Sequence, residues 1–214
     1  MRPVRNESSM KIGILGGTGR MGQGLARGYA AVGHEVFLGS RSPQRAADIA
    51  SELAGGISGG SLSEAAEFGE LVVLAVPFGD AAEIVEAVQD SLAEKIVIDI
   101  TNPFGAVPPG QVAGIENNSR AAASARWVAA YKTTFWKTLD GGRGHDGQPL
   151  DVFVCSLDAE AKAVVMELIT ATGFRAVDCG GFENARTLDL MVPLMIELDG
   201  RHQTDARSSW KFLG

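Results

Sequence analysis

Cysteine, histidine and long apolar runs are scarce in this chain of 214 residues. It contains 2 cysteines and 3 histidines, and Cys155 and Cys179 lie in neither a zinc-ligand nor a redox-pair spacing. A disulfide framework, a bound metal and a thiol-based active site are therefore not expected, and a reducing, cytoplasmic environment is predicted. No apolar run approaches the roughly 18 residues of a membrane span, and the first residues lack the pattern of a signal peptide.

An excess of positive charge is also missing. The chain has 26 Asp and Glu against 19 Lys and Arg, a formal net charge of −7. Binding to nucleic acid or to an anionic membrane surface is therefore not expected. Hydrophobic residues make up 45% of the chain, which suffices for the packed core of one large domain, or of one domain and a small lobe.

Short apolar segments alternate with helical patterns along the chain. Apolar residues at helical spacing lie over 84–92 and 161–169, as expected of helices that cover a sheet. Such alternation predicts an α/β fold, a Rossmann-type doubly wound, mostly parallel sheet with a small C-terminal lobe. The expected strands are Ile12–Leu15, Glu35–Leu38, Leu71–Val76, Ile96–Ile100, Trp127–Ala130, Val152–Cys155 and Phe174–Val177.

Composition changes along the chain indicate three parts. We expect an N-terminal extension at 1–9, a nucleotide-binding domain at 10–125 and a C-terminal lobe at 126–214 that binds the second substrate and dimerises. The proline- and glycine-rich segment 102–110 is typical of a loop before that boundary. A helix is expected over 182–198, apolar on nearly every side and interrupted by Pro193. A partner subunit would cover such a helix, which favours a homodimer over a monomer with a buried central helix.

Glycine is abundant, with 27 residues, and several surround one strand-to-helix turn. Gly17, Gly19 and Gly22 form a G-x-G-x-x-G pattern between the first strand and a helix expected over 21–31. In this context Gly17 permits a tight turn, Gly19 lets the backbone approach a pyrophosphate, and Gly22 allows close packing of helix and strand. The helix N-terminus offers N–H donors to the phosphates. Four glycine pairs are expected to be turns: 55–56, 59–60, 141–142 and 180–181.

The end of the second expected strand carries cations in place of a carboxylate. Proteins that bind NAD place Asp or Glu here, about 20 residues after the glycines, for the ribose hydroxyls. This chain has Ser40, Arg41 and Arg45. Guanidinium and hydroxyl groups can bind a 2′-phosphate, so the pattern predicts NADP(H). The alternative is that both arginines are solvated residues at a helix start.

Five segments together resemble a known family. They are Leu15–Gly19, Gly39–Arg41, Leu74–Phe78, Asp99–Pro103 and, more weakly, Trp210–Leu213. Over nearly the whole chain the sequence resembles the F420-dependent NADP reductases and, more distantly, the NADPH-binding domain of the six-transmembrane metalloreductases. The resemblance implies coenzyme F420 as second substrate. It places Thr18, Gly19, Arg20 and Met21 at the pyrophosphate, Ser40, Arg41 and Arg45 at the 2′-phosphate, and Val76, Pro77 and Asn102 at the nicotinamide.

The segment 128–136 departs from the family pattern. Relatives carry Val-Lys-Ala-Phe-Asn-Thr or His-Thr-Ile-Pro here, whereas this chain has Ala129 in place of the lysine and Lys132 at the polar position. Residues 118–145 hold five basic residues against one acidic residue. A positive segment with interleaved aromatics suits a planar anionic acceptor, either a deazaflavin or a flavin nucleotide; the alternative is a solvated basic helix with aromatic core residues. The candidate substrate-binding residues are Lys132, Thr133, Phe135 and Trp136.

Hydride transfer between nicotinamide and an acceptor ring requires close, dry stacking rather than a nucleophile. No catalytic side chain is therefore assigned. Three functions stay open: an NADPH-linked reductase of F420, an NADPH-linked reductase of a flavin, ferric chelate or quinone, and a non-catalytic NADP(H)-binding regulator. The last would apply if Phe135 and Trp136 block the seat of a second ring.

Overall fold

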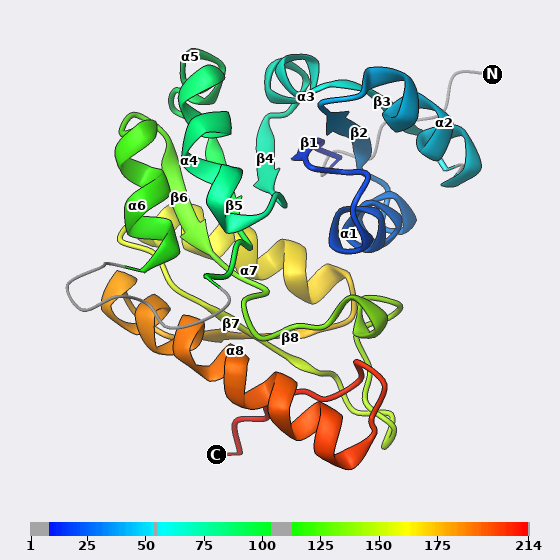
Figure 1. The fold of residues 1–214 in the computed structure, drawn as a ribbon, viewed down its shortest axis with the longest axis vertical. Coiled ribbons are helices and arrows are strands. Elements are labelled where there is room, and N and C mark those ends of the chain that lie inside the picture. Colours follow the sequence, from blue (N-terminus) through cyan, green and yellow to red (C-terminus); the bar gives the residue numbers. More distant parts are fainter. Residues whose placement is uncertain (1–8, 54, 104–112, 214) are drawn as a thin grey trace.

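A computed structural model describes residues 9–53, 55–103 and 113–213. Its main element is a six-stranded sheet, parallel at every pairing, in the order β3-β2-β1-β4-β5-β6 (Figure 1). The strand order reverses between β1 and β4, as in a doubly wound fold, and the predicted fold class is confirmed. The strands are β1 (Lys11–Leu15), β2 (Glu35–Ser40), β3 (Ile57–Ser61), β4 (Leu71–Leu74), β5 (Ile96–Asp99) and β6 (Arg126–Ala129).

Helices cover both faces of this sheet. Buried side chains of α1, α2 and α7 join one core cluster, and those of α3 to α6 and the start of α8 join the other. Both faces are thereby shielded from water, which is why the central strands are apolar throughout. The helices are α1 (Arg20–Ala31), α2 (Pro43–Leu53), α3 (Leu62–Phe68), α4 (Phe78–Ala87), α5 (Gln89–Leu92), α6 (Gly114–Ala121), α7 (Ala159–Ala171) and α8 (Phe182–His202), with a 3-10 turn η1 (Trp136–Thr138).

The strand β3 was not expected, because its sequence contains two adjacent glycines. Gly59 and Gly60, predicted as a turn, pair with Leu38 and Gly39 of β2, so that prediction was wrong. A Cβ atom on Gly59 would lie 2.3 Å from the carbonyl oxygen of Ala46 in α2. Glycine is therefore required here by the close approach of a helix backbone, a use that outweighs its poor strand propensity.

The C-terminal part adds a second, two-stranded parallel sheet. It consists of β7 (Asp151–Val154) and β8 (Arg175–Asp178), and an antiparallel bridge from Ala129 to Cys155 links it to β6. The boundary predicted at residue 126 lies at the first residue of β6, so the sixth strand belongs to the main sheet. After β6 the chain continues through β7, α7, β8 and α8 (Figure 1).

Helix α8 continues through Pro193 and ends at His202, beyond the predicted end at 198. It buries Leu188, Val192 and Met195 against the rest of the chain. Leu190 and Leu194 are 58% and 52% exposed. In the single chain, therefore, only one side of the helix is covered. Among the described residues, no helix combines the length and apolar character needed to cross a bilayer.

Candidate functional site

The turn between β1 and α1 is crowded on the side of the sheet. Gly16 has a φ of +86°, and a Cβ atom on Gly17 would lie 2.8 Å from the Cβ atom of Leu38. A Cβ atom on Gly22 would lie 2.7 Å from the Cα atom of Gly17. The left-handed turn residue is thus Gly16, not Gly17 as predicted, while Gly17 and Gly22 permit close packing of the loop, β2 and α1.

The other side of the same turn is open. Gly19 is the N-cap of α1, and a Cβ atom there would meet one atom, the Gly16 carbonyl oxygen at 3.4 Å. No described side chain caps this helix, and its first turn contains no acidic residue. The N–H groups that begin α1 are therefore available as donors, which fits a pyrophosphate bound against the backbone at Gly19.

Beside this turn lies the smaller cavity, of about 320 Å³, formed at the ends of β1, β2 and β4. Its lining includes Ser40, Arg41 and Arg45, the three residues predicted to bind a 2′-phosphate. The Arg41 side chain is 75% exposed, and its guanidinium lies 3.4 Å from the Asp80 carboxylate. Such an exposed ion pair is weak. Two arginines and a hydroxyl at one end of the crevice fit the phosphate that distinguishes NADP(H) from NAD(H).

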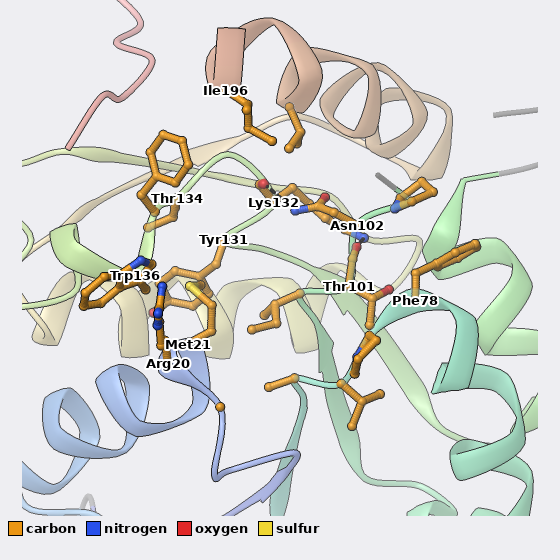
Figure 2. Close-up of a pocket in the computed structure, with 18 of the residues that line it drawn as sticks. Arg20, Met21, Phe78, Thr101, Asn102, Tyr131, Lys132, Thr134, Trp136 and Ile196 are labelled. Carbon is orange, nitrogen blue, oxygen red and sulfur yellow. Dashed lines mark hydrogen bonds between the residues drawn. The ribbon is translucent and has the colours of Figure 1, made fainter. Parts of the chain in front are cut away.

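The larger cavity, of about 810 Å³, shares Gly19, Ala75, Val76 and Pro77 with the smaller one. It lies at the carboxyl ends of β4, β5 and β6, beside the point where the strand order reverses, where ligands bind in open α/β sheets. Figure 2 shows Arg20, Met21 and Trp136 on one side, Phe78, Thr101 and Asn102 on the other, and Ile196 projecting from α8. Side chains far apart in the sequence thus enclose one space next to the nucleotide turn.

Most residues predicted for the nicotinamide and the acceptor meet on this wall. Val76, Pro77, Asn102, Phe135 and Trp136 all line the larger cavity. Several others were not among the predicted site residues, although some of them lie in segments that the sequence analysis singled out. These are Phe78, Ile100, Thr101, Tyr131, Thr134, Val192, Met195 and Ile196. The signal for the first three was their place just after the ends of β4 and β5, whereas no local signal marks the α8 residues.

Lys132 lies on the wall of the larger cavity, but its ammonium group is not exposed to the cavity. The side chain is fully buried; its Nζ lies 3.5 Å from Oδ1 of Asp99 and 3.3 Å from Oδ1 of Asp189, and it donates a hydrogen bond to the Thr101 carbonyl oxygen. We therefore correct the prediction that Lys132 binds the anionic groups of an acceptor, because its charge is already compensated. Thr133 is 2% exposed and is not among the lining residues of the larger cavity.

The residues Asp99, Lys132 and Asp189 form a buried charge cluster that connects β5, the segment after β6, and α8. Asp99 accepts hydrogen bonds of 2.7 Å from both the backbone N–H and the hydroxyl of Thr101, and one of 2.8 Å from the Asn118 amide. Asp189 accepts one of 2.9 Å from the Gly114 N–H. Burial raises the pKa of Asp189, while the charge of Lys132 opposes that rise. The cluster fixes the part of α8 that leads to the cavity wall.

Tyr131 begins the turn that carries the chain from β6 to the cavity wall. Its φ of +55° is unusual for an aromatic residue. Its hydroxyl lies 3.5 Å from that of Tyr29, and its ring meets Phe174 edge to face, with centroids 6.0 Å apart. Burial raises the pKa of Tyr131 to about 12 and that of Tyr29 well above its usual value, so both stay protonated at neutral pH. Buried contacts hold the strained turn, which places Thr134 and Phe135 at the larger cavity.

The expected positive segment is mostly neutralised in the fold. Arg126 binds Asp158 with two hydrogen bonds of 2.6 and 2.9 Å, Lys137 pairs with Asp205 at 2.5 Å, and Lys132 belongs to the buried charge cluster. Counting charges along the chain therefore overestimated the positive potential at the acceptor side. The partners are the N-cap of α7 and residues of α8, the tail and β5, none of which is close in sequence.

The described cysteines and histidines lie outside both cavities. Cys155 and Cys179 are free thiols, and His34 accepts a hydrogen bond from the Met10 N–H through Nδ1. Within residues 9–53, 55–103 and 113–213, no three His, Cys, Asp or Glu side chains are grouped as metal ligands would be. The two cavities therefore offer hydrogen-bond donors, apolar walls and guanidinium groups, with the Asp80 carboxylate beside Arg41 in the smaller one.

Comparison with known proteins agrees with this geometry. Residues 11–103 match the family model "NADP oxidoreductase coenzyme F420-dependent". The chain is 32% identical over 211 residues to the F420-dependent NADP reductase of Methanothermobacter thermautotrophicus, a match that covers 91% of each protein. It is 29% identical over 191 residues to the metalloreductase STEAP3 of Rattus norvegicus, covering 87% of this chain and 37% of that protein.

A solved structure from Arthrobacter sp. FB24, described as a candidate F420-dependent NADP reductase, superposes with a TM-score of 0.86 at 29% identity. The match covers 96% of this chain and 100% of that one. These findings confirm the resemblance predicted from the five sequence segments. The chain belongs to the family of F420-dependent NADP reductases.

Proposed function

We propose that this protein is an oxidoreductase that transfers a hydride between NADP(H) and coenzyme F420. The observation that carries the proposal is the pair of adjacent cavities, which share four lining residues. One ends at Arg41 and Arg45, and the other widens beyond Val76 and Pro77 into about 810 Å³ of mostly apolar space. A nucleotide can extend from one into the other and leave room for a second ring beside its nicotinamide.

We assign the two ends of NADP(H) to different groups. Ser40, Arg41 and Arg45 would hold the 2′-phosphate, and the N–H groups that begin α1 would hold the pyrophosphate. Val76, Pro77 and Asn102 would face the nicotinamide. When bound, the nicotinamide supplies or accepts the hydride, so the protein has to bind, orient and keep water out.

The walls of the larger cavity suit this task. Ile100, Phe135 and Met195 present apolar surface that excludes water from a bound ring. Two polar atoms on the wall are buried without a hydrogen-bond partner among the described residues, Oδ1 of Asn102 and Oγ1 of Thr134. Such atoms favour a ligand with polar groups at its edge, because each gains a hydrogen bond on binding. We propose that they orient the reacting rings; Phe135 and Trp136 lie on the wall and leave this space open.

Rapid mixing of the purified protein and NADPH with F420, FMN and a ferric chelate in turn tests the proposal. Following NADPH oxidation, we expect turnover with F420 and little with the other two acceptors. Turnover with FMN alone would overturn the F420 assignment in favour of a flavin reductase. Tight NADPH binding without turnover of any acceptor would instead favour a regulator.

We also propose that two copies of the chain associate through α8. Its exposed face carries Leu190 and Leu194, one turn apart, whose apolar side chains are exposed to water in the single chain. A homodimer would bury these side chains and shield the adjoining cavity, which Ile196 of the same helix lines. Sedimentation at micromolar concentration should give about twice the chain mass of 22.4 kDa; a species of the single-chain mass would contradict the proposal.

The remaining assignments concern the lobe and the location. We propose that residues 126–214 supply the acceptor side of the site, through the turn at Tyr131 and through α8, while 10–125 bind NADP(H). We also propose a cytoplasmic location, which the two free thiols support.

A further inference from the structure

The larger cavity has basic but no acidic residues on its described wall. Two of the lining residues, Arg20 and Lys132, carry positive charge. The Lys132 ammonium is enclosed by Asp99 and Asp189 and has no exposed surface. Of the described lining residues, this leaves Arg20 as the cation that can meet a ligand.

Arg20 is held in place by an aromatic ring rather than by a carboxylate. Its guanidinium carbon lies 5.0 Å from the centroid of the Trp136 ring (Figure 2). In the part of the chain that the structure describes, no ion pair or hydrogen bond occupies its side chain. A guanidinium group that rests on an aromatic face keeps its N–H donors free at the edge. The Arg20 side chain is therefore held in place by Trp136, while its N–H donors stay free to bind a ligand.

The platform beneath Arg20 is itself fixed. The Lys137 ammonium lies 5.3 Å from the centroid of the same ring and pairs with Asp205 at 2.5 Å. That pairing compensates the charge of Lys137. Arg20, by contrast, has no carboxylate partner among the described residues. Two cations therefore lie over the Trp136 ring, Arg20 from α1 and Lys137 from η1. Of these two, only Arg20 lines the larger cavity.

Arg20 lines a different cavity from the two arginines that are proposed to bind the 2′-phosphate. Arg41 and Arg45 line the smaller cavity, whereas Arg20 lines the larger one and is absent from the lining of the smaller. Gly19 lines both cavities, and the backbone at this turn already offers N–H donors for a pyrophosphate. The side chain of Arg20 therefore lines the cavity in which the nicotinamide and the acceptor are proposed to meet.

We propose that Arg20, seated on Trp136, binds an anionic group of the electron acceptor. The site would then prefer an acceptor with a phosphate or carboxylate tail over the same ring without one. This inference rests on the proposed function, since it concerns the acceptor in the larger cavity, and it moves the acceptor-binding charge from Lys132 to Arg20. Charge-assisted hydrogen bonds of an arginine to such a group strengthen binding by roughly tenfold or more.

The test compares F420 with its tail-less analogue, the same deazaflavin without phosphate and glutamate. Equilibrium dissociation constants are measured calorimetrically for both ligands and for NADPH, and KM values are measured for both acceptors. In Arg20→Gln we expect the dissociation constant of F420 to rise about tenfold, while those of the analogue and of NADPH change less than twofold. The wild-type preference for F420 should also fall as salt is raised.

Arg27→Gln is the matched control, because it removes the same charge from an exposed position on the same helix, outside both cavities. It should leave all three dissociation constants unchanged. Trp136→Leu should weaken F420 more than the analogue by removing the platform, and Trp136→Phe should restore part of the difference.

Four results would overturn the inference. A loss confined to NADPH in Arg20→Gln would assign this side chain to the pyrophosphate, and equal losses for F420 and its analogue would remove any role for the tail. If the wild-type protein reduces F420 and Arg20→Gln binds F420 as tightly as wild type does, Arg20 takes no part in binding F420. A wild type that neither binds nor reduces F420 would overturn the proposed function first, and this inference with it.

Discussion

At the smaller cavity the cations Arg41 and Arg45 stand at the surface, whereas at the larger cavity the cation Lys132 is enclosed by two carboxylates. The exposed arginines come from one short stretch after β2, and the ion pair of Arg41 with Asp80 is exposed to solvent. The enclosed lysine depends on β5 and α8. Charge in the first region is thus available to a ligand, while charge in the second holds the wall together.

The comparison predicts that Lys132 matters most for stability. Lys132→Met would leave Asp99 and Asp189 buried without their cation, which should lower the free energy of unfolding by about 3–5 kcal/mol. Urea denaturation of the purified variant would measure this loss. The control Arg201→Gln removes an exposed ion pair with Glu197 and should change stability little. A Lys132→Met variant as stable as wild type would show that the cluster does not hold α8.

Arg41 is expected to matter for ligand choice and hardly for stability. Arg41→Ala should weaken NADPH binding by about tenfold or more, because a charge-assisted contact with the 2′-phosphate is lost. NADH, which lacks that phosphate, should bind the variant as it binds wild type. Calorimetric titration with both nucleotides checks this. Equal losses for the two would place Arg41 away from the phosphate and erase the contrast between the cavities.

A smaller effect is expected where the start of β6 meets α7, away from both cavities. Hydrogen bonds from Arg126 and from the Ala161 N–H lower the pKa of Asp158 to about 2, from an ordinary value of 3.8. Because the pKa is lower in the folded state, the carboxylate stabilises the protein above about pH 3.8, and this contribution is lost as the pH falls toward 2.

Asp158→Asn should therefore lose modest stability at pH 7 and show a flatter decline than wild type between pH 4 and pH 2. Urea denaturation at a series of pH values measures both slopes. Parallel slopes would mean that the Arg126 pair contributes nothing to acid sensitivity. NADPH binding should be unchanged at pH 7, since neither residue lines a cavity.

The expected strands show how far local patterns reach. All seven predicted strands are present within one or two residues, because each is a short apolar run flanked by turn residues. The strand β3 escaped detection, since Gly59 and Gly60 resemble a turn unless the approach of α2 is known. Likewise, no local signal showed that Asp189 of α8 would be a partner of Lys132.

The candidate site divides in the same way. The glycine turn, Ser40, Arg41 and Arg45 lie within one contiguous stretch of β1, α1, β2 and α2, so their chemistry could be predicted from spacing. At the acceptor side, Lys132 was assigned to a ligand although its ammonium is buried. The assignment of Arg20 to the pyrophosphate stays a prediction; its side chain lines the larger cavity.

From the order of its residues alone, the chain determines its alternating fold, its nucleotide turn and the cations at the end of β2, because each signal is local. Tertiary structure decides which charges remain free. A cation is neutralised only by a carboxylate that comes within a few ångströms, and for Lys132 those carboxylates come from β5 and α8. For Arg20 the neighbour in space is an aromatic ring, which holds the side chain and leaves its charge to a ligand.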